Sequence, residues 1–83
     1  MTDLELTHTL MATVREQLHQ PDLEYDPASA LRAVPAYDSV MAIQLVLGLE
    51  RTFDLMLDED EIEMMNTLGD IFMILRSRVS VDA

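Results

Sequence analysis

The chain has 83 residues, no cysteine, and 16 acidic side chains against five basic ones, which gives a formal net charge of −11. A single domain of this length buries roughly 60% of its unfolded surface, so a deep catalytic cleft is not expected. The missing cysteines exclude disulfides, thiolate nucleophiles and cysteine-bound metals, and the negative charge disfavours nucleic acid and anionic membranes as partners.

The first predicted element is an amphipathic helix over residues 3–19. Leucine and valine side chains recur at four-residue steps from residue 6 to residue 18, which is the spacing of one buried helix face. Pro21 disfavours helix at the residue before it, so the helix should end there. Residues 21–37 then form a long connection with three prolines, which we expect to pack on the core and to hold a short helical turn.

A second helix is predicted over residues 38–53, and either Asp38 or Ser39 can cap its first turn. At about 100° per residue both of its faces are apolar. The inner face includes Leu45 and Leu49, while the outer face needs a second burial partner, either inside the domain or on another protein.

Two further helices complete the chain. The acidic residues 58–61 suit the first turn of a short helix over residues 59–65, because negative charge is favoured at the N-terminal end of the helix dipole. A longer helix over residues 67–79 begins with Thr67 and Asp70, which form the pattern of a capping box. We therefore predict an all-α fold, a small four-helix bundle with three longer helices, one short helix and a long loop between the first two.

Neither a metal site nor a catalytic site is predicted. Ile62 stands where a calcium loop that begins at Asp58 needs its third oxygen ligand, and no glycine stands at the sixth position. No Ser-His-Asp or Cys-His arrangement, and no glycine-rich phosphate loop, can be assembled from the sequence.

The middle of the chain carries two motifs at a set spacing. They are Asp38-Ser39-Val40 and Leu45-Val46-Leu47-Gly48-Leu49-Glu50, followed by Phe53, an acidic turn and Thr67. This pattern resembles the acyl carrier protein family. The resemblance implies one acyl-carrier-like domain over residues 1–83. It also implies that Ser39 receives 4′-phosphopantetheine from coenzyme A, transferred by a separate Mg²⁺-dependent phosphopantetheinyl transferase. The chain would then be a non-catalytic carrier that holds acyl groups as thioesters for fatty-acid, polyketide or other specialised lipid or metabolite synthesis.

The position of Ser39 suits this role. A phosphodiester on the first residue of a helix lies beside unpaired backbone amides and the positive end of the helix dipole. The thiol at the end of the arm supplies the nucleophile that a cysteine-free chain lacks. Asp38 would be the flanking cap, and the alternative reading is that Asp38 and Ser39 do no more than cap the helix.

The outer face of the second helix departs from the family. Met41, Gln44 and Arg51 occupy positions where the family commonly has acid, so we expect partners to recognise this face more by shape and burial than by charge. The predicted recognition surface comprises Val40, Met41, Ile43, Gln44, Leu47, Glu50 and Arg51. The alternative is that these side chains pack on the long loop or on the third helix.

The residues before the Asp-Ser pair also differ from the family. Pro35-Ala36-Tyr37 replaces a segment in which many members have glycine two residues before the aspartate, and this favours a specialised member. Tyr37 either packs beside the prosthetic arm or covers the loop.

The resemblance further implies a cavity for the acyl chain within the core. Methionine suits such a cavity, because its side chain is flexible and polarisable. The predicted cavity and core residues are Leu45, Val46, Leu49, Phe53, Met56, Ile62, Met65, Leu68, Ile71 and Phe72.

The expected partners are the phosphopantetheinyl transferase and acyl-loading, condensing or acyltransferase enzymes with basic or apolar docking surfaces. The negative charge argues against nucleic acid as a partner. The first residues are acidic and the longest apolar run is too short to span a bilayer, so we expect no stable membrane insertion and a cytoplasmic location. We also expect a monomer. Two alternatives stay open: an unmodified acidic helical adaptor for a partner protein, and a peptidyl or aminoacyl carrier. The sequence leaves the cargo and the pathway undetermined.

Overall fold

The computed structural model describes residues 1–79. Within this range the chain forms α1 (Asp3–Leu18), the 3₁₀ turn η1 (Leu31–Ala33), α2 (Ser39–Phe53), α3 (Glu59–Glu63) and α4 (Leu68–Arg78). The predicted all-α bundle of three longer helices and one short helix is confirmed, with helix ends shifted by one or two residues. Residues 80–83 of the predicted domain lie outside the described residues.

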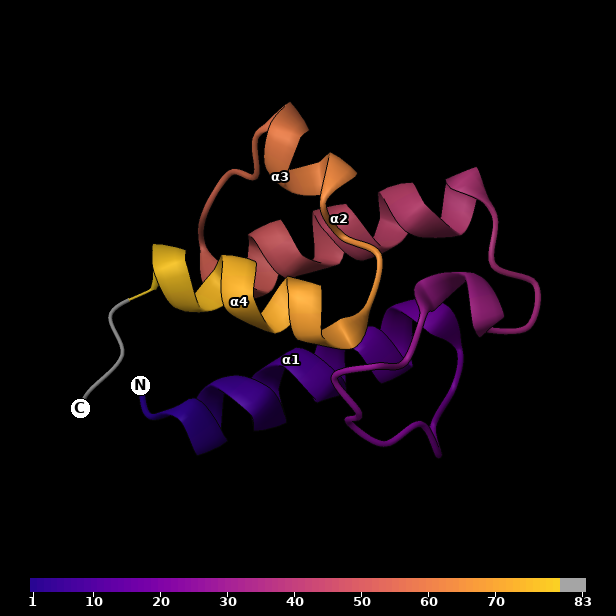
Figure 1. The fold of residues 1–83 in the computed structure, drawn as a ribbon, viewed down its shortest axis with the longest axis horizontal. Coiled ribbons are helices and arrows are strands. Elements are labelled where there is room, and N and C mark those ends of the chain that lie inside the picture. Colours follow the sequence, from indigo (N-terminus) through magenta and orange to yellow (C-terminus); the bar gives the residue numbers. More distant parts are fainter. Residues whose placement is uncertain (80–83) are drawn as a thin grey trace.

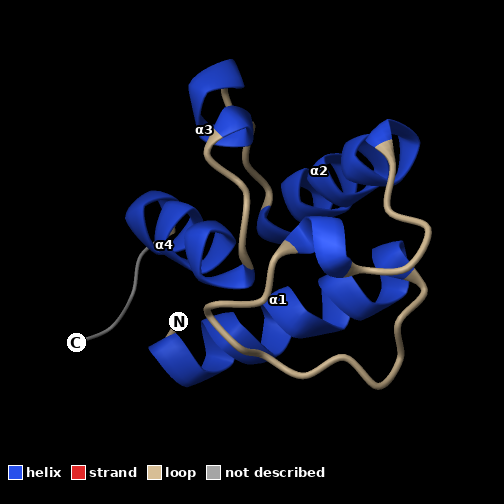
Figure 2. Cartoon of the chain, turned by 45° about the vertical axis from the view of Figure 1, so that its right-hand side comes forward, coloured by secondary structure: helices blue, strands red, loops and turns tan. Residues whose placement is uncertain are grey.

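The three longer helices enclose the core, and α3 lies apart from it. α3 lies over α2 and α4, on the side away from α1 (Figures 1 and 2). Leucines dominate the buried core, and α1 supplies the largest share of it because its whole four-residue stripe faces inward. The core consists of Leu6, Leu10, Met11, Val14, Leu18, Leu31, Leu45, Leu49, Leu57, Leu68, Ile71, Ile74 and Leu75.

Side-chain caps mark where the helices begin. The predicted capping box of Thr67 and Asp70 is confirmed, and α1 and α3 also begin with capping boxes, at Thr2 and Asp58. Each box satisfies backbone amides that have no partner within the helix. α2 begins with a single cap, the carboxylate of Asp38.

The long connection between α1 and α2 packs on the start of α4, as expected, and η1 is its short helical turn. The Leu31 amide donates to the Asn66 carbonyl at 2.9 Å, and the Gly69 amide donates to the Pro27 carbonyl at 3.1 Å. A Cβ atom on Gly69 would lie 2.8 Å from that Pro27 oxygen. Glycine is therefore required at the first turn of α4 for the loop to approach this closely.

Two of the predicted cavity and core residues, Met56 and Ile62, are not part of the core. Met56 is 74% exposed, because in the loop after α2 the inward position is taken by Leu57. Ile62 is 39% exposed, because α3 has five residues and buries none of them. The remaining predicted side chains are buried (Leu45, Leu49, Leu68 and Ile71) or partly buried against the core (Val46, Phe53, Met65 and Phe72).

Substitutions on opposite faces of α2 test this burial pattern. Leu49→Ala should lower the free energy of unfolding by about 2–5 kcal/mol, because Leu49 is fully buried and truncation leaves a cavity. Leu47→Ala is the matched control, since Leu47 is 50% exposed, and its effect should stay within about 0.5 kcal/mol. Urea denaturation followed by circular dichroism measures both, and equal losses would contradict the assignment of the faces.

Candidate functional site

Ser39 is the first residue of α2 and is exposed. Its position follows from the chain: the loop ends in extended backbone at Asp38, and the helix begins at the next residue. The Ser39 hydroxyl makes no hydrogen bond to any other residue in the range 1–79. The side chain is therefore an accessible nucleophile for an enzyme that approaches the end of α2.

The first turn of α2 is arranged to receive an anion. The Asp38 carboxylate accepts a hydrogen bond from the Met41 amide at 2.9 Å, which confirms Asp38 as the cap. The amides of Ser39 and Val40 have no acceptor among the described residues. Two free amides at the positive end of a 15-residue helix provide donors for a phosphate oxygen.

The residues before the cap hold the backbone in a strained turn. Ala36 has φ 63°, in the left-handed region that L-residues other than glycine adopt at a cost. Tyr37 follows it and is partly buried against the core, so burial raises the pKa of its phenol, an effect opposed by the positive charge of Arg32. Tyr37 thus packs against the core directly before the Asp38 cap.

The outer face of α2 is apolar and uncovered. Val40, Ile43 and Leu47 recur along it and are each at least half exposed, and Gln44 and Arg51 are exposed beside them. These five predicted recognition residues do lie on one accessible surface, which we call the outer α2 face.

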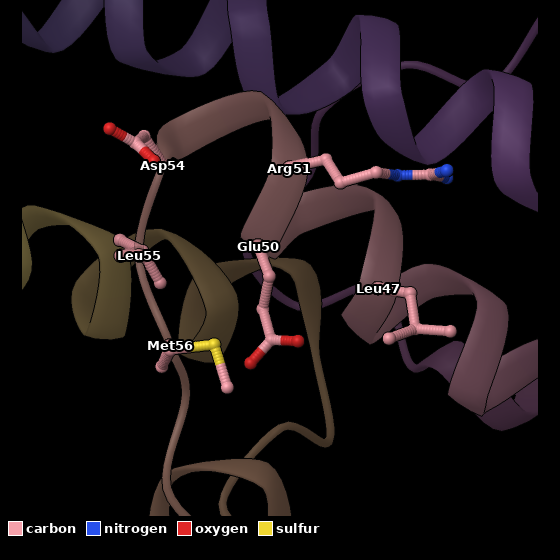
Figure 3. Close-up of a pocket in the computed structure, with 6 residues that line it drawn as sticks. All are labelled: Leu47, Glu50, Arg51, Asp54, Leu55 and Met56. Atoms are coloured by element: carbon pink, nitrogen blue, oxygen red, sulfur yellow. The ribbon is translucent and has the colours of Figure 1, made fainter.

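Two predicted recognition residues have other contacts. Met41 is partly buried and packs against the core. The Glu50 carboxylate accepts a hydrogen bond from the Leu57 amide at 2.8 Å, so it holds the loop that leads to α3. Glu50 points towards Met56 and this loop, whereas Arg51 extends in another direction (Figure 3). Glu50 therefore has a structural role, because its carboxylate fixes the loop at Leu57 and is not fully available to a partner protein.

An apolar pocket of about 270 Å³ lies between α2 and α3. Ala42, Ile43, Val46 and Leu47 form its α2 side, and Ile62 lines it on the α3 side. Ile43 lies one helical turn after Ser39, so the pocket begins on the same side of α2 as the Ser39 hydroxyl. Ile62, predicted as a cavity or core residue, is outside the core but does line this pocket.

Neither a metal cluster nor a membrane-spanning helix is found among the described residues. No three His, Cys, Asp or Glu side chains within residues 1–79 are placed to share a metal ion. None of the helices in that range is long and apolar enough to cross a membrane.

Comparison with known proteins gives a family match. Residues 8–72 match the protein family described as "Phosphopantetheine attachment site", and this range includes Ser39. A comparison with curated proteins finds no significant match. A solved structure described as "a putative acyl carrier protein" from Mycobacterium tuberculosis has a TM-score of 0.79 and 22% sequence identity, over 89% of this chain and 99% of that chain. At this identity the likeness shows the shared fold.

Removing the strain next to the site should stabilise the protein. Ala36→Gly should raise the free energy of unfolding by roughly 1 kcal/mol, because glycine adopts positive φ without a steric cost. Ala12→Gly, in the middle of α1, is the control and should lower the stability by about 1 kcal/mol. Thermal and urea unfolding measure both, and a loss of stability in Ala36→Gly would contradict the strained turn.

Proposed function

The chain belongs to the phosphopantetheine-attachment family, and from that premise we propose that Ser39 is the attachment residue and that the cargo is an acyl group. Members of this family are carriers with a covalently attached 4′-phosphopantetheine, and they work with a phosphopantetheinyl transferase and synthase enzymes. When attached, this group supplies a thiol that holds cargo as a thioester.

The observation that carries the proposal is the exposed Ser39 hydroxyl at the start of α2, inside the matched segment. Ser39 presents an oxygen that a transferase can reach. The amides of Ser39 and Val40 stabilise the negative charge of the phosphodiester, and the helix dipole adds to this stabilisation. Asp38 acts through its cap, which holds Ser39 at the corner between loop and helix.

The apolar pocket between α2 and α3 supports an acyl cargo. Ala42, Ile43 and Val46 line it with hydrocarbon, and Leu47 and Ile62 complete it. Burying a hydrocarbon chain there removes apolar surface from water, at about 0.8 kcal/mol for each methylene group. An aminoacyl or peptidyl cargo would instead place polar groups against this lining, which is unfavourable without hydrogen-bond partners.

The outer α2 face is proposed as the docking surface for the partner enzymes. Its apolar side chains, Val40, Ile43 and Leu47, stand on the same helix as the attachment residue. Within α2 itself the one carboxylate is that of Glu50, and it accepts a hydrogen bond from the Leu57 amide. Partners should therefore recognise this face through apolar contact, and the reaction steps belong to those enzymes.

Loading of the purified protein tests the attachment residue. After incubation with coenzyme A, Mg²⁺ and a broad-specificity phosphopantetheinyl transferase, intact-mass spectrometry should show one added group on the wild type and none on Ser39→Ala. Ser77→Ala, which removes another serine on α4, is the control and should load like the wild type. Loading of Ser39→Ala would contradict the assignment, and no loading of the wild type by several transferases would favour the unmodified adaptor.

Substitution on the outer α2 face tests the docking proposal. Ile43→Ser should lower kcat/KM for phosphopantetheinyl transfer by roughly tenfold, because it removes an apolar contact near the centre of the face. Met73→Ser is the control, since Met73 is as exposed as Ile43 but lies on α4, and it should change kcat/KM less than about twofold. Raising the ionic strength should have little effect on the wild-type value, and a steep fall would show recognition by charge instead.

A further inference from the structure

α3 is a short helix with weak attachment to the core. It buries none of its residues, and helices of this length have little stability of their own. The chain is anchored on either side of it: Leu57 is buried before α3, and the Asn66 carbonyl accepts from the Leu31 amide after it. The segment between these two anchors therefore has little buried surface to hold it in place.

One arginine on α4 contacts both α3 and the loop before it. The Arg78 guanidinium forms an ion pair with the Glu61 carboxylate on α3. It also donates to the Met56 carbonyl at 2.7 Å, in the loop before α3. Glu61 in turn accepts from the Asp58 amide at 3.1 Å, which closes the capping box of α3. Arg78 thus ties both α3 and the loop leading to it to the end of α4.

A second arginine on α4 provides a comparison. Arg76 pairs with Asp3 of α1 at 3.0 Å, and the two side chains are 48% and 54% exposed. In the pair between Arg78 and Glu61 the exposed fractions are 35% and 17%. The Arg78–Glu61 pair is therefore screened less by solvent than the Arg76–Asp3 pair. It also contacts α3, the helix that buries none of its residues.

We propose that the Arg78–Glu61 ion pair is a latch that holds α3 over the apolar pocket and sets how readily the pocket widens. Ile62 is the pocket wall contributed by α3, so a displacement of α3 changes the space beside Ala42 and Val46. Arg78 is a positioning residue, because it acts through α3. The effect of Arg78 on cargo binding in the pocket rests on the function proposed above. Its effect on the position of α3 is independent of that function.

Amide hydrogen exchange of the unmodified protein tests the latch itself. Arg78→Gln should speed exchange about tenfold at Ile62, Met64 and Met65, whose amides are hydrogen-bonded within this segment, and leave α1 unchanged. Arg76→Gln is the matched control and should leave all three rates unchanged. Glu61→Gln should reproduce the effect of Arg78→Gln, and the double variant should add little to it.

Arg78→Lys gives a further check, because it keeps the charge without the planar fork that spans Glu61 and the Met56 carbonyl; it should restore part of the protection. Unchanged exchange in Arg78→Gln, or an equal rise throughout α1 and α4, would overturn the latch.

Chain length of the cargo tests the link to the pocket. On protein loaded at Ser39, the difference in Tm between the octanoyl and acetyl forms should be larger in Arg78→Gln than in the wild type or in Arg76→Gln. In Arg78→Gln the octanoyl chain can displace α3 without breaking the ion pair, so its burial stabilises the protein more. An equal difference in all three proteins would overturn the role in cargo. Failure to load any of them would contradict the proposed function and leave the exchange result as the test of the latch.

Discussion

The Asp38 carboxylate holds the Met41 amide at 2.9 Å, and this cap determines where α2 begins. From that start the periodicity of the helix places every later side chain. Ser39 stands exposed at the corner, Leu45 and Leu49 turn into the core, and Ile43 and Leu47 turn outward. A start one residue later would make Ser39 the cap residue, and Asp38 would no longer hold the first turn.

The second constraint is the small size of the domain. α1 packs along the inner side of α2, and α3 is too short to cover the outer side. An apolar face and an apolar pocket therefore remain open next to Ser39. An unpaired apolar surface costs solubility in a monomer, so its presence here fits a protein that meets partners and cargo there. The high negative charge offsets this cost by keeping the molecules apart.

Local sequence rules were sufficient for the helices, the Thr67 capping box and the two faces of α2, because caps and apolar periodicity depend on residues a few positions apart. They failed where contacts join distant segments. Leu57 instead of Met56 is buried because the Glu50 carboxylate holds the loop, and Arg78 reaches Glu61 across 17 positions. Ile62 lies in a hydrophobic pattern, but α3 is too short to bury it. The attachment residue stays a prediction from position and family.

The most direct test of the account is peptide mapping of the protein purified from the cells that make it. The account predicts that the fragment containing Ser39 carries phosphopantetheine, with an acyl group on a fraction of the molecules. A Ser39 fragment recovered only without modification, or the group attached to another residue, would contradict it.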